Sequence, residues 1–164
     1  MGELMTSKNP EMRVGEAFPD FDLEASDGER YSLDSLKGSW SVIFFYPRDG
    51  TTGCTAQSCA FRDKFSVFQE FGVKIFGVSS NSISSHQRFI SDNQLPFILL
   101  SDKGGVLRKE LGIRKTLWFI PGRVTFVIDP AGLIRKVINS QFFFSKHSEV
   151  AANFIEESIA HGKN

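Results

Sequence analysis

The feature that most constrains the fold is a buried strand followed directly by a helix. Residues Ser41 to Pro47, SVIFFYP, form a continuous apolar run that ends at a proline. Such a run is typical of a strand that is buried on both faces of a sheet. From Cys54 onward, apolar residues recur at helical spacing until Gly72. We therefore expect a central strand over 41–47 and a helix that follows it directly.

The rest of the chain continues this alternation of strands and helices. Asp27-Gly28 interrupts alternating apolar positions near the start, which predicts an N-terminal hairpin. Beyond the central helix the pattern predicts a strand over 73–80, a helix over 82–94, a strand over 96–102, a short helix over 104–113, two strands joined by a turn over 123–140, and a last helix over 145–162. The order indicates an α/β fold with a mixed central β-sheet flanked by helices, which is the thioredoxin-like arrangement.

Length and charge narrow the class of protein. The 164 residues suit one compact domain, and we expect a flexible N-terminal segment over 1–15 before a single thioredoxin-like domain over 16–164. Lysine plus arginine balance aspartate plus glutamate at 19 each, without a basic stripe, so we expect no nucleic acid and no membrane as partners. The start lacks the apolar segment of a secretory signal. We expect a cytoplasmic protein, or one of an organelle stroma if the chain is a processed form.

Both cysteines of the chain lie where the central strand passes into the helix. Cys54 falls at the expected helix start, where backbone N–H groups and the helix dipole favour the thiolate, the reactive form of a thiol. Cys59 follows five residues later. Along one helix their Cα atoms would lie about 8.6 Å apart, beyond the roughly 7 Å that a disulfide spans. A bond between them therefore requires the first helical turn to unwind.

The same stretch resembles a known family. Pro47, Thr51 and Cys54 stand as P-x-x-x-T-x-x-C, which is similar to the active-site pattern of peroxiredoxins. With AFRDKF, LPFILLSD and PGRVTFVID, the resemblance covers nearly the whole chain and is to the peroxiredoxin Q subfamily, also called bacterioferritin comigratory protein. It implies a thiol peroxidase that reduces hydrogen peroxide and organic hydroperoxides to water and alcohols, in antioxidant defence and cell redox homeostasis. It also implies that no metal and no organic cofactor is needed.

The resemblance further implies a catalytic cycle. Cys54 is the peroxidatic cysteine, whose thiolate the peroxide oxidises to a sulfenic acid. Cys59 is the resolving cysteine, which condenses with that sulfenic acid to form an intramolecular disulfide. Thioredoxin or a glutaredoxin then reduces the disulfide by thiol–disulfide exchange. The family tendency is a monomer, with a dimer as the alternative.

Five further residues match positions that have a role in the family. Thr51 would bond the peroxide and the sulfur, and Pro47 would shield the thiolate from water. Arg123, in PGRVTFVID, would stabilise the charge that develops on the leaving oxygen. The backbone N–H of Gly53 would add a donor to the peroxide, and Gln57 would bond the arginine.

One residue departs from the family pattern. Relatives commonly read T-P-G-C at the helix start, where this chain has Thr52 before the glycine. A proline would fix the backbone there and reduce the entropy of the unwound loop. We therefore expect Thr52 to make the unwound, oxidised form easier to reach.

Two other functions and one kind of metal site are alternatives to the peroxidase. A protein dithiol–disulfide oxidoreductase normally uses C-x-x-C, so the longer spacing disfavours that activity. A peroxide-sensing module, in which oxidation is a trigger, stays open as a second role. The histidines His86, His147 and His161 have no ligand spacing to the cysteines, which disfavours a zinc site.

Some charged and aromatic residues near the motif have a simpler interpretation. We expect Arg48 to be a solvated loop charge, and Arg62 and Asp63 to have a structural role. Most phenylalanines fall on strand or helix positions that face a core. The aromatic clusters at 117–121 and 141–147 lie in connecting segments, where two roles stay open: lining a peroxide entrance or forming a partner surface.

Overall fold

A computed structural model describes residues 9–115 and 122–161 of the chain. Within these ranges seven strands form one mixed sheet in the order β2-β1-β5-β4-β3-β6-β7. The pairs β3–β4 and β4–β5 are parallel, and the other neighbouring pairs are antiparallel. The strands are β1 Asp22–Ala25, β2 Arg30–Ser32, β3 Ser41–Phe45, β4 Lys74–Ser79, β5 Ile98–Ser101, β6 Val124–Ile128 and β7 Ile134–Asn139.

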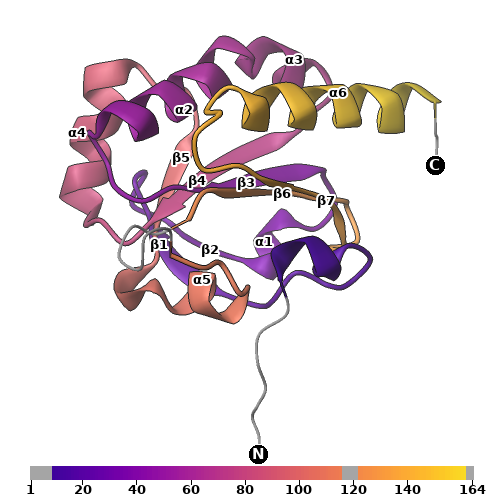
Figure 1. Ribbon diagram of the computed structural model, residues 1–164, viewed down its shortest axis with the longest axis horizontal. Helices are drawn as coiled ribbons and strands as arrows, with labels where there is room; N and C mark the ends of the chain where they lie inside the picture. The colour runs from indigo at the N-terminus through magenta and orange to yellow at the C-terminus, as the bar shows by residue number, and fades with distance from the viewer. Residues whose placement is uncertain (1–8, 116–121, 162–164) are drawn as a thin grey trace, which may run out of the picture.

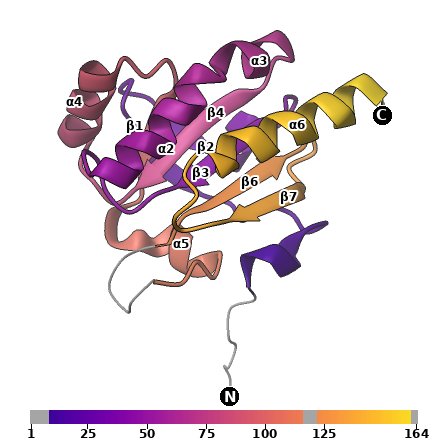
Figure 2. The same ribbon diagram turned by 45° about the horizontal axis from the view of Figure 1, so that its top comes forward.

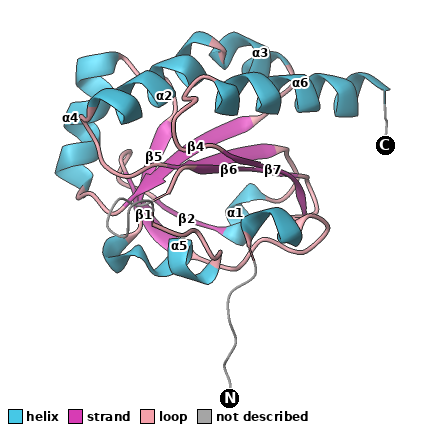
Figure 3. Ribbon diagram, viewed as in Figure 1, coloured by secondary structure: helices cyan, strands magenta, loops and turns pink. Residues whose placement is uncertain are grey.

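Helices cover both faces of this sheet. In Figure 1, α2, α3, α4 and α6 lie on one side of it, whereas α1 and α5 lie on the other, and Figure 3 shows the same layers coloured by secondary structure. The helices described are α1 Leu33–Leu36, α2 Thr52–Asp63, α3 Phe65–Glu70, α4 Ile83–Asn93, α5 Val106–Glu110 and α6 Lys146–His161, with 3-10 turns η1 Pro10–Arg13 and η2 Lys103–Gly105. The predicted α/β, thioredoxin-like arrangement is confirmed.

Strand β3 separates two hydrophobic cores, because its side chains alternate between the faces of the sheet. Val42 and Phe44 pack with the helices α2, α3, α4 and α6, whereas Ile43 and Phe45 pack on the side of α1 and α5. All five residues of the strand are buried, as its apolar run predicts. The prediction that it is the central strand was wrong by one position: β4 occupies the middle of the order, because the hairpin β1–β2 is added beyond β5.

The predicted helix from Cys54 to Gly72 is divided into two. Helix α2 ends at Asp63 and α3 begins at Phe65, with Lys64 between them at φ −99° and ψ 5°. Phe61 in α2 and Phe68 in α3 are both buried in the same core. The apolar spacing that predicts one helix is therefore satisfied equally by two. In Figures 1 and 2, α2 lies next to α6 on this face, and the two helices are in contact.

The N-terminal region contains the predicted hairpin and, before it, the 3-10 turn η1. The predicted hairpin is confirmed, since β1 and β2 pair around a turn in which Gly28 has φ +87°, a value that favours glycine. Ordered structure begins before the expected boundary at residue 16. Pro10 is buried in η1, and Arg13 donates to the carbonyl groups of Glu110 and Leu111 at 2.8 and 3.3 Å.

Within the described residues no helix is both long and apolar enough to cross a membrane.

Candidate active site

The peptide between β3 and α2 holds Cys54 in a fixed place. Thr51 is the N-cap of α2, and its hydroxyl accepts a hydrogen bond from the Cys54 N–H at 3.4 Å. The same hydroxyl donates to the carbonyl oxygen of Arg48 at 3.3 Å, which closes the loop of residues 46–51 over the helix start. The Cys54 side chain is completely buried there. Helix geometry thus places the thiol in the first turn of α2, as the sequence predicts.

Two N–H donors point at the sulfur of Cys54. Arg123 Nη1 lies 3.2 Å from Sγ, and the backbone N–H of Arg48 donates to Sγ at 3.4 Å. The Arg48 side chain itself is exposed, as expected. A cation and a peptide N–H beside a buried sulfur favour the negatively charged thiolate. The site therefore stabilises an anion at the position of the thiol.

Arg123 is held from three directions. Its Nη1 also donates to Gln57 Oε1 at 2.9 Å, which agrees with the predicted pairing of these two residues. Gln141 accepts from the arginine twice, through its side-chain oxygen from the backbone N–H at 3.0 Å and through its carbonyl oxygen from Nε at 3.1 Å. The ring of Phe144 lies 4.8 Å from the guanidinium carbon, a cation–π contact. Because the arginine is only 6 % exposed, these contacts fix its orientation on the sulfur.

Gly53 leaves no room for a side chain beside the arginine. A Cβ atom at this position would lie 2.7 Å from Arg123 Nη2 and 2.8 Å from the ring of Phe144. Both distances are shorter than any normal carbon contact, so a larger residue would displace the guanidinium or the ring. The small size of this residue, as well as its N–H group, therefore matters for the site.

The predicted roles of Thr51 and Pro47 remain predictions. In this structure the Thr51 hydroxyl caps the helix and donates to a carbonyl, and its residue is exposed. Pro47 is half-buried beside the loop.

Cys59 lies on the same helix, and neither cysteine is in a disulfide. It is half-buried, and its thiol lies 3.9 Å from Asn93 Oδ1 at the end of α4. Arg62 donates to the carbonyl oxygen of Asn93 at 2.8 Å and contacts Asp63 at 3.1 Å, a structural role like the one we expected. Since α2 is continuous through both cysteines, its first turn must open before they can bond.

Sequence reasoning missed several residues that complete the site. Gln141 and Phe144 come from the aromatic segment 141–147, for which the sequence allows several roles, and they hold the arginine. Arg108 is also buried close to the thiol; burial lowers its pKa, and the charges of Asp102 and Cys54 oppose that shift. Residues 117–121, the other aromatic segment, lie outside the described residues. Only proximity in the folded chain identifies these partners, because nothing in their local sequence marks them.

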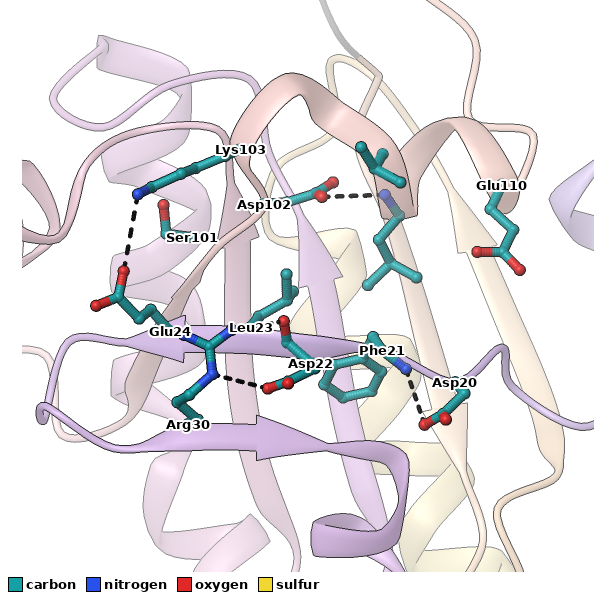
Figure 4. A pocket seen from close by; sticks show the side chains of 12 residues that line it. Asp20, Phe21, Asp22, Leu23, Glu24, Arg30, Ser101, Asp102, Lys103 and Glu110 are labelled. Atoms are coloured by element: carbon teal, nitrogen blue, oxygen red, sulfur yellow. Dashed lines mark hydrogen bonds and ion pairs between the residues drawn. The ribbon is translucent and has the colours of Figure 1, made fainter.

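The part of the molecule that the structure describes offers no group of three or more metal-ligating side chains. A groove of about 330 Å³ does lie elsewhere, between β1 and α5 (Figure 4). Its basic side chains are paired inside it, Arg30 with Asp22 at 2.9 Å and Lys103 with Glu24 at 3.8 Å. It contains none of the residues around Cys54, so the thiol site is separate from it.

Known proteins are similar to this chain in sequence. The AhpC/TSA family model matches residues 14–137. Chloroplastic peroxiredoxin Q of Populus jackii is 41 % identical over 143 residues, which are 87 % of this chain and 67 % of that protein. The chain spans about two thirds of the length of such curated relatives.

Solved structures agree with the sequence comparison. The peroxidoxin BcpB from Mycobacterium tuberculosis has a TM-score of 0.80 at 30 % identity, covering 88 % of this chain and 96 % of that one. A structure of Xanthomonas campestris peroxiredoxin Q has a TM-score of 0.78 at 29 % identity, covering 87 % and 92 %. The resemblance that the motif around Cys54 predicted is confirmed. The chain belongs to the AhpC/TSA family, and its relatives there include peroxiredoxin Q proteins.

Proposed function

We propose that this protein is a thiol peroxidase in which Cys54 is the peroxidatic cysteine. The observation that carries the proposal is the pair of donors on its sulfur, Arg123 Nη1 at 3.2 Å and the backbone N–H of Arg48 at 3.4 Å. Both interactions are stronger with a thiolate than with a thiol. The thiolate is the form of cysteine that reacts with peroxide.

The reaction is a two-electron oxidation of sulfur. The thiolate attacks one peroxide oxygen, the S–O bond forms as the O–O bond breaks, and the leaving oxygen takes a proton to become water or an alcohol. Negative charge moves from the sulfur to the leaving oxygen during this step. Arg123 is already fixed beside the sulfur by Gln57 and Gln141, so its remaining N–H groups need little reorganisation to stabilise that charge. The product on the protein is a sulfenic acid.

Cys59 is the resolving cysteine in this proposal. Its sulfur attacks the sulfenic sulfur, an S–S bond forms and water leaves. Thioredoxin or a glutaredoxin then returns two electrons by thiol–disulfide exchange, so the cycle requires no metal or organic cofactor. Before the S–S bond can form, the first turn of α2 must leave the Thr51 cap. We propose that the protein carries out this cycle as a monomer.

The substrates and the cellular setting follow from the same chemistry. Alkyl peroxide reduction activity is attributed to the bacterioferritin comigratory protein of Xanthomonas campestris, for which trapped intermediate/ligand complex structures are known. We propose that this chain also accepts organic hydroperoxides besides hydrogen peroxide, and acts in antioxidant defence and redox homeostasis. A dithiol protein must reduce the disulfide, so we expect a reducing compartment, either the cytoplasm or an organelle like that of the chloroplastic relatives.

Intact mass after oxidation tests the two cysteine roles. Reduced parent protein treated with one equivalent of hydrogen peroxide is expected to consume it and to lose about 2 Da, since two hydrogens leave as the disulfide forms. Cys59→Ser is expected to consume the same equivalent but to gain about 16 Da, and about 32 Da with excess peroxide, because the sulfenic acid is not resolved. Parent protein that gains about 16 Da, as Cys59→Ser should, in place of losing about 2 Da would contradict the resolving role of Cys59.

The same preparation separates the peroxidase from its two rivals. A dithiol–disulfide oxidoreductase would reduce insulin disulfides and leave peroxide unconsumed. A sensing module would be oxidised once but would not turn over when thioredoxin, its reductase and NADPH are supplied. Steady NADPH oxidation that depends on peroxide supports the proposed enzyme. Parent protein that consumes no peroxide would overturn it.

Thr52→Pro tests the effect of the unusual helix start. Thr52 is exposed and is the first helical residue of α2. Proline fits at this position, because the backbone N–H there has no acceptor within the helix. Fixing this residue disfavours the unwound loop, so disulfide formation should slow about two- to fivefold. Rapid quenching, with the sulfenic and disulfide forms counted by mass, measures both steps. The rate of sulfenic acid formation should be the same in Thr52→Pro and in the parent. An unchanged rate of disulfide formation would contradict the expected effect of Thr52.

A further inference from the structure

A buried hydrogen-bond network beside the 46–51 loop is centred on Asp49. Its carboxylate, 5 % exposed, accepts from the Tyr46 hydroxyl at 2.6 Å and from the Ser85 hydroxyl at 2.8 Å. The ring of His86, which is fully buried, places Nδ1 2.7 Å from the same carboxylate. Ser85 and His86 lie in the first turn of α4. The loop that covers the thiol is thereby tied to a helix outside the active-site motif.

The partners of His86 determine how many protons the pair holds. Nε2 lies 3.0 Å from the carbonyl oxygen of Leu100, which can only accept, so Nε2 carries a hydrogen. A neutral ring would then present the lone pair of Nδ1 to the Asp49 carboxylate at 2.7 Å. Two buried acceptors at that distance repel each other unless a proton lies between them. The pair therefore holds one proton between Nδ1 and Oδ2.

A second buried histidine among the described residues, His147, has different hydrogen-bond partners. His147 Nε2 also lies near a carbonyl oxygen, that of Ser140 at 2.7 Å, but its Nδ1 lies 2.7 Å from the hydroxyl of Thr125, which can donate. A neutral ring satisfies both partners. In agreement, burial lowers the pKa of His147 to about 4. One chain thus contains two buried histidines with a different expected proton content.

The peptide groups on both sides of Arg48 connect this network to the sulfur. The N–H of Arg48 donates to Cys54 Sγ at 3.4 Å, and its carbonyl oxygen accepts from the Thr51 hydroxyl at 3.3 Å. The next N–H, that of Asp49, donates to Asn81 Oδ1 at 2.9 Å. Asp49 is thus the residue directly after the one whose N–H donates to the sulfur.

We propose that His86 and Asp49 are positioning residues for the reactive thiol, and that the proton they share keeps the Arg48 N–H on Cys54. Without the charge of Asp49 the tie between the loop and α4 is weaker, the 46–51 loop loosens, and the sulfur loses one of its two donors. This inference rests on the proposed role of Cys54. It predicts that Cys54 reacts more slowly when the Asp49 carboxylate is removed.

Other titratable groups surround the pair and must be separated from it. Tyr46 stays a donor to Asp49, because burial and then the Asp49 charge raise its pKa well above its ordinary value. Arg108 on α5 donates to the carbonyl oxygen of Tyr46 at 3.0 Å. On α4, Arg88 and Asp92 line the same small cavity as Asp49. Of these groups, Asp92 is exposed and serves as a control.

Nitrogen-15 NMR of the histidine side chains tests the proton content directly. In the reduced parent protein at neutral pH, we expect two protonated ring nitrogens for His86, or a protonated Asp49 carboxyl if the proton lies on oxygen. His147 is the internal control, with Nε2 protonated and Nδ1 bare. A neutral His86 beside an ionised Asp49 would overturn the proposal. This readout does not depend on peroxidase activity.

Asp49→Asn tests the link to the thiol. The amide can donate to a neutral His86 and accept from Tyr46, so the network no longer needs the extra proton. We expect a lower rate constant with peroxide at neutral pH, because neutral hydrogen bonds replace charge-assisted ones. The decrease should be about tenfold, the effect of one lost hydrogen bond to a charged group. The matched Asp92→Asn should keep the parent rate.

The reaction of Cys54 with iodoacetamide, in the Cys59→Ser background, distinguishes a failure of the proposed peroxidase function from a failure of the positioning role. If peroxide is not consumed but alkylation is about tenfold slower in Asp49→Asn than in the parent, the proposed function fails and the positioning role stands. If Asp49→Asn reacts at the parent rate with either reagent, the positioning role is wrong. A correctly folded variant is confirmed by its amide spectrum.

Discussion

Cys54→Ser is expected to lose peroxide consumption completely, a decrease on the order of 10³-fold or more, because a hydroxyl is not ionised near neutral pH and cannot replace the thiolate. The substitution changes one buried atom and leaves the donors of Arg123 and Arg48 facing an oxygen acceptor. The fold should therefore be kept. Peroxide loss measured with a dye that detects remaining hydrogen peroxide, at equal protein concentration, gives the result.

Cys59→Ser is the matched control for this experiment. It removes the other thiol of the chain through the same atomic change, yet should retain the first equivalent of peroxide consumption. If Cys54→Ser consumes peroxide and Cys59→Ser does not, the two roles are reversed. If neither variant loses peroxide consumption, Cys54 is not required for the reaction.

Arg123→Met is expected to slow the reaction with peroxide by about 10²- to 10³-fold, the usual effect of removing one fixed donor from developing charge. The methionine side chain is of similar length but carries no charge and no N–H group. It also leaves Gln57 Oε1 and the Gln141 carbonyl oxygen without their partner, which should reduce the free energy of unfolding by about 1–3 kcal/mol.

Stopped-flow measurement of the second-order rate constant tests this prediction, with thermal unfolding of each variant measured in parallel. Arg123→Lys should be intermediate, because it keeps the charge but loses the planar fork that reaches Cys54, Gln57 and Gln141 together. Arg30→Met, in the groove of Figure 4, removes an exposed arginine outside the site and is the control. A full rate in Arg123→Met would show that the arginine holds structure and does not act in the reaction.

Much of the local structure could be predicted, because it depends on neighbours in sequence. The apolar run over 41–47 and the helical spacing after Cys54 place the thiol at a strand-to-helix junction, and β3 and α2 occur there. The hairpin around Gly28 follows from its turn residues in the same way. The break at Lys64 was missed, because Phe61 and Phe68 face one core whether the helix is continuous or divided.

The position of Arg123 beside Cys54 depends on tertiary structure and could not be predicted from local sequence. It is 69 residues from Cys54 in the chain, and their contact depends on β3 pairing with β6. That antiparallel register sets Phe45 opposite Val124, so the residue before β6 lies beside the loop that follows β3. Family resemblance predicted the residue, but no local pattern predicts the register that brings it to the sulfur.

The sequence by itself determined the thiol chemistry of this protein, since one cysteine at a helix start and a second five residues later need only local helix geometry to be interpreted. The contact of Asp49 with His86, and the proton that we propose they share, depend on tertiary structure alone. These residues are 37 positions apart, and in the sequence His86 is only a scattered histidine without a metal partner. Its proton content depends on which atoms face its two nitrogens, and only the packing of α4 against the 46–51 loop determines those atoms.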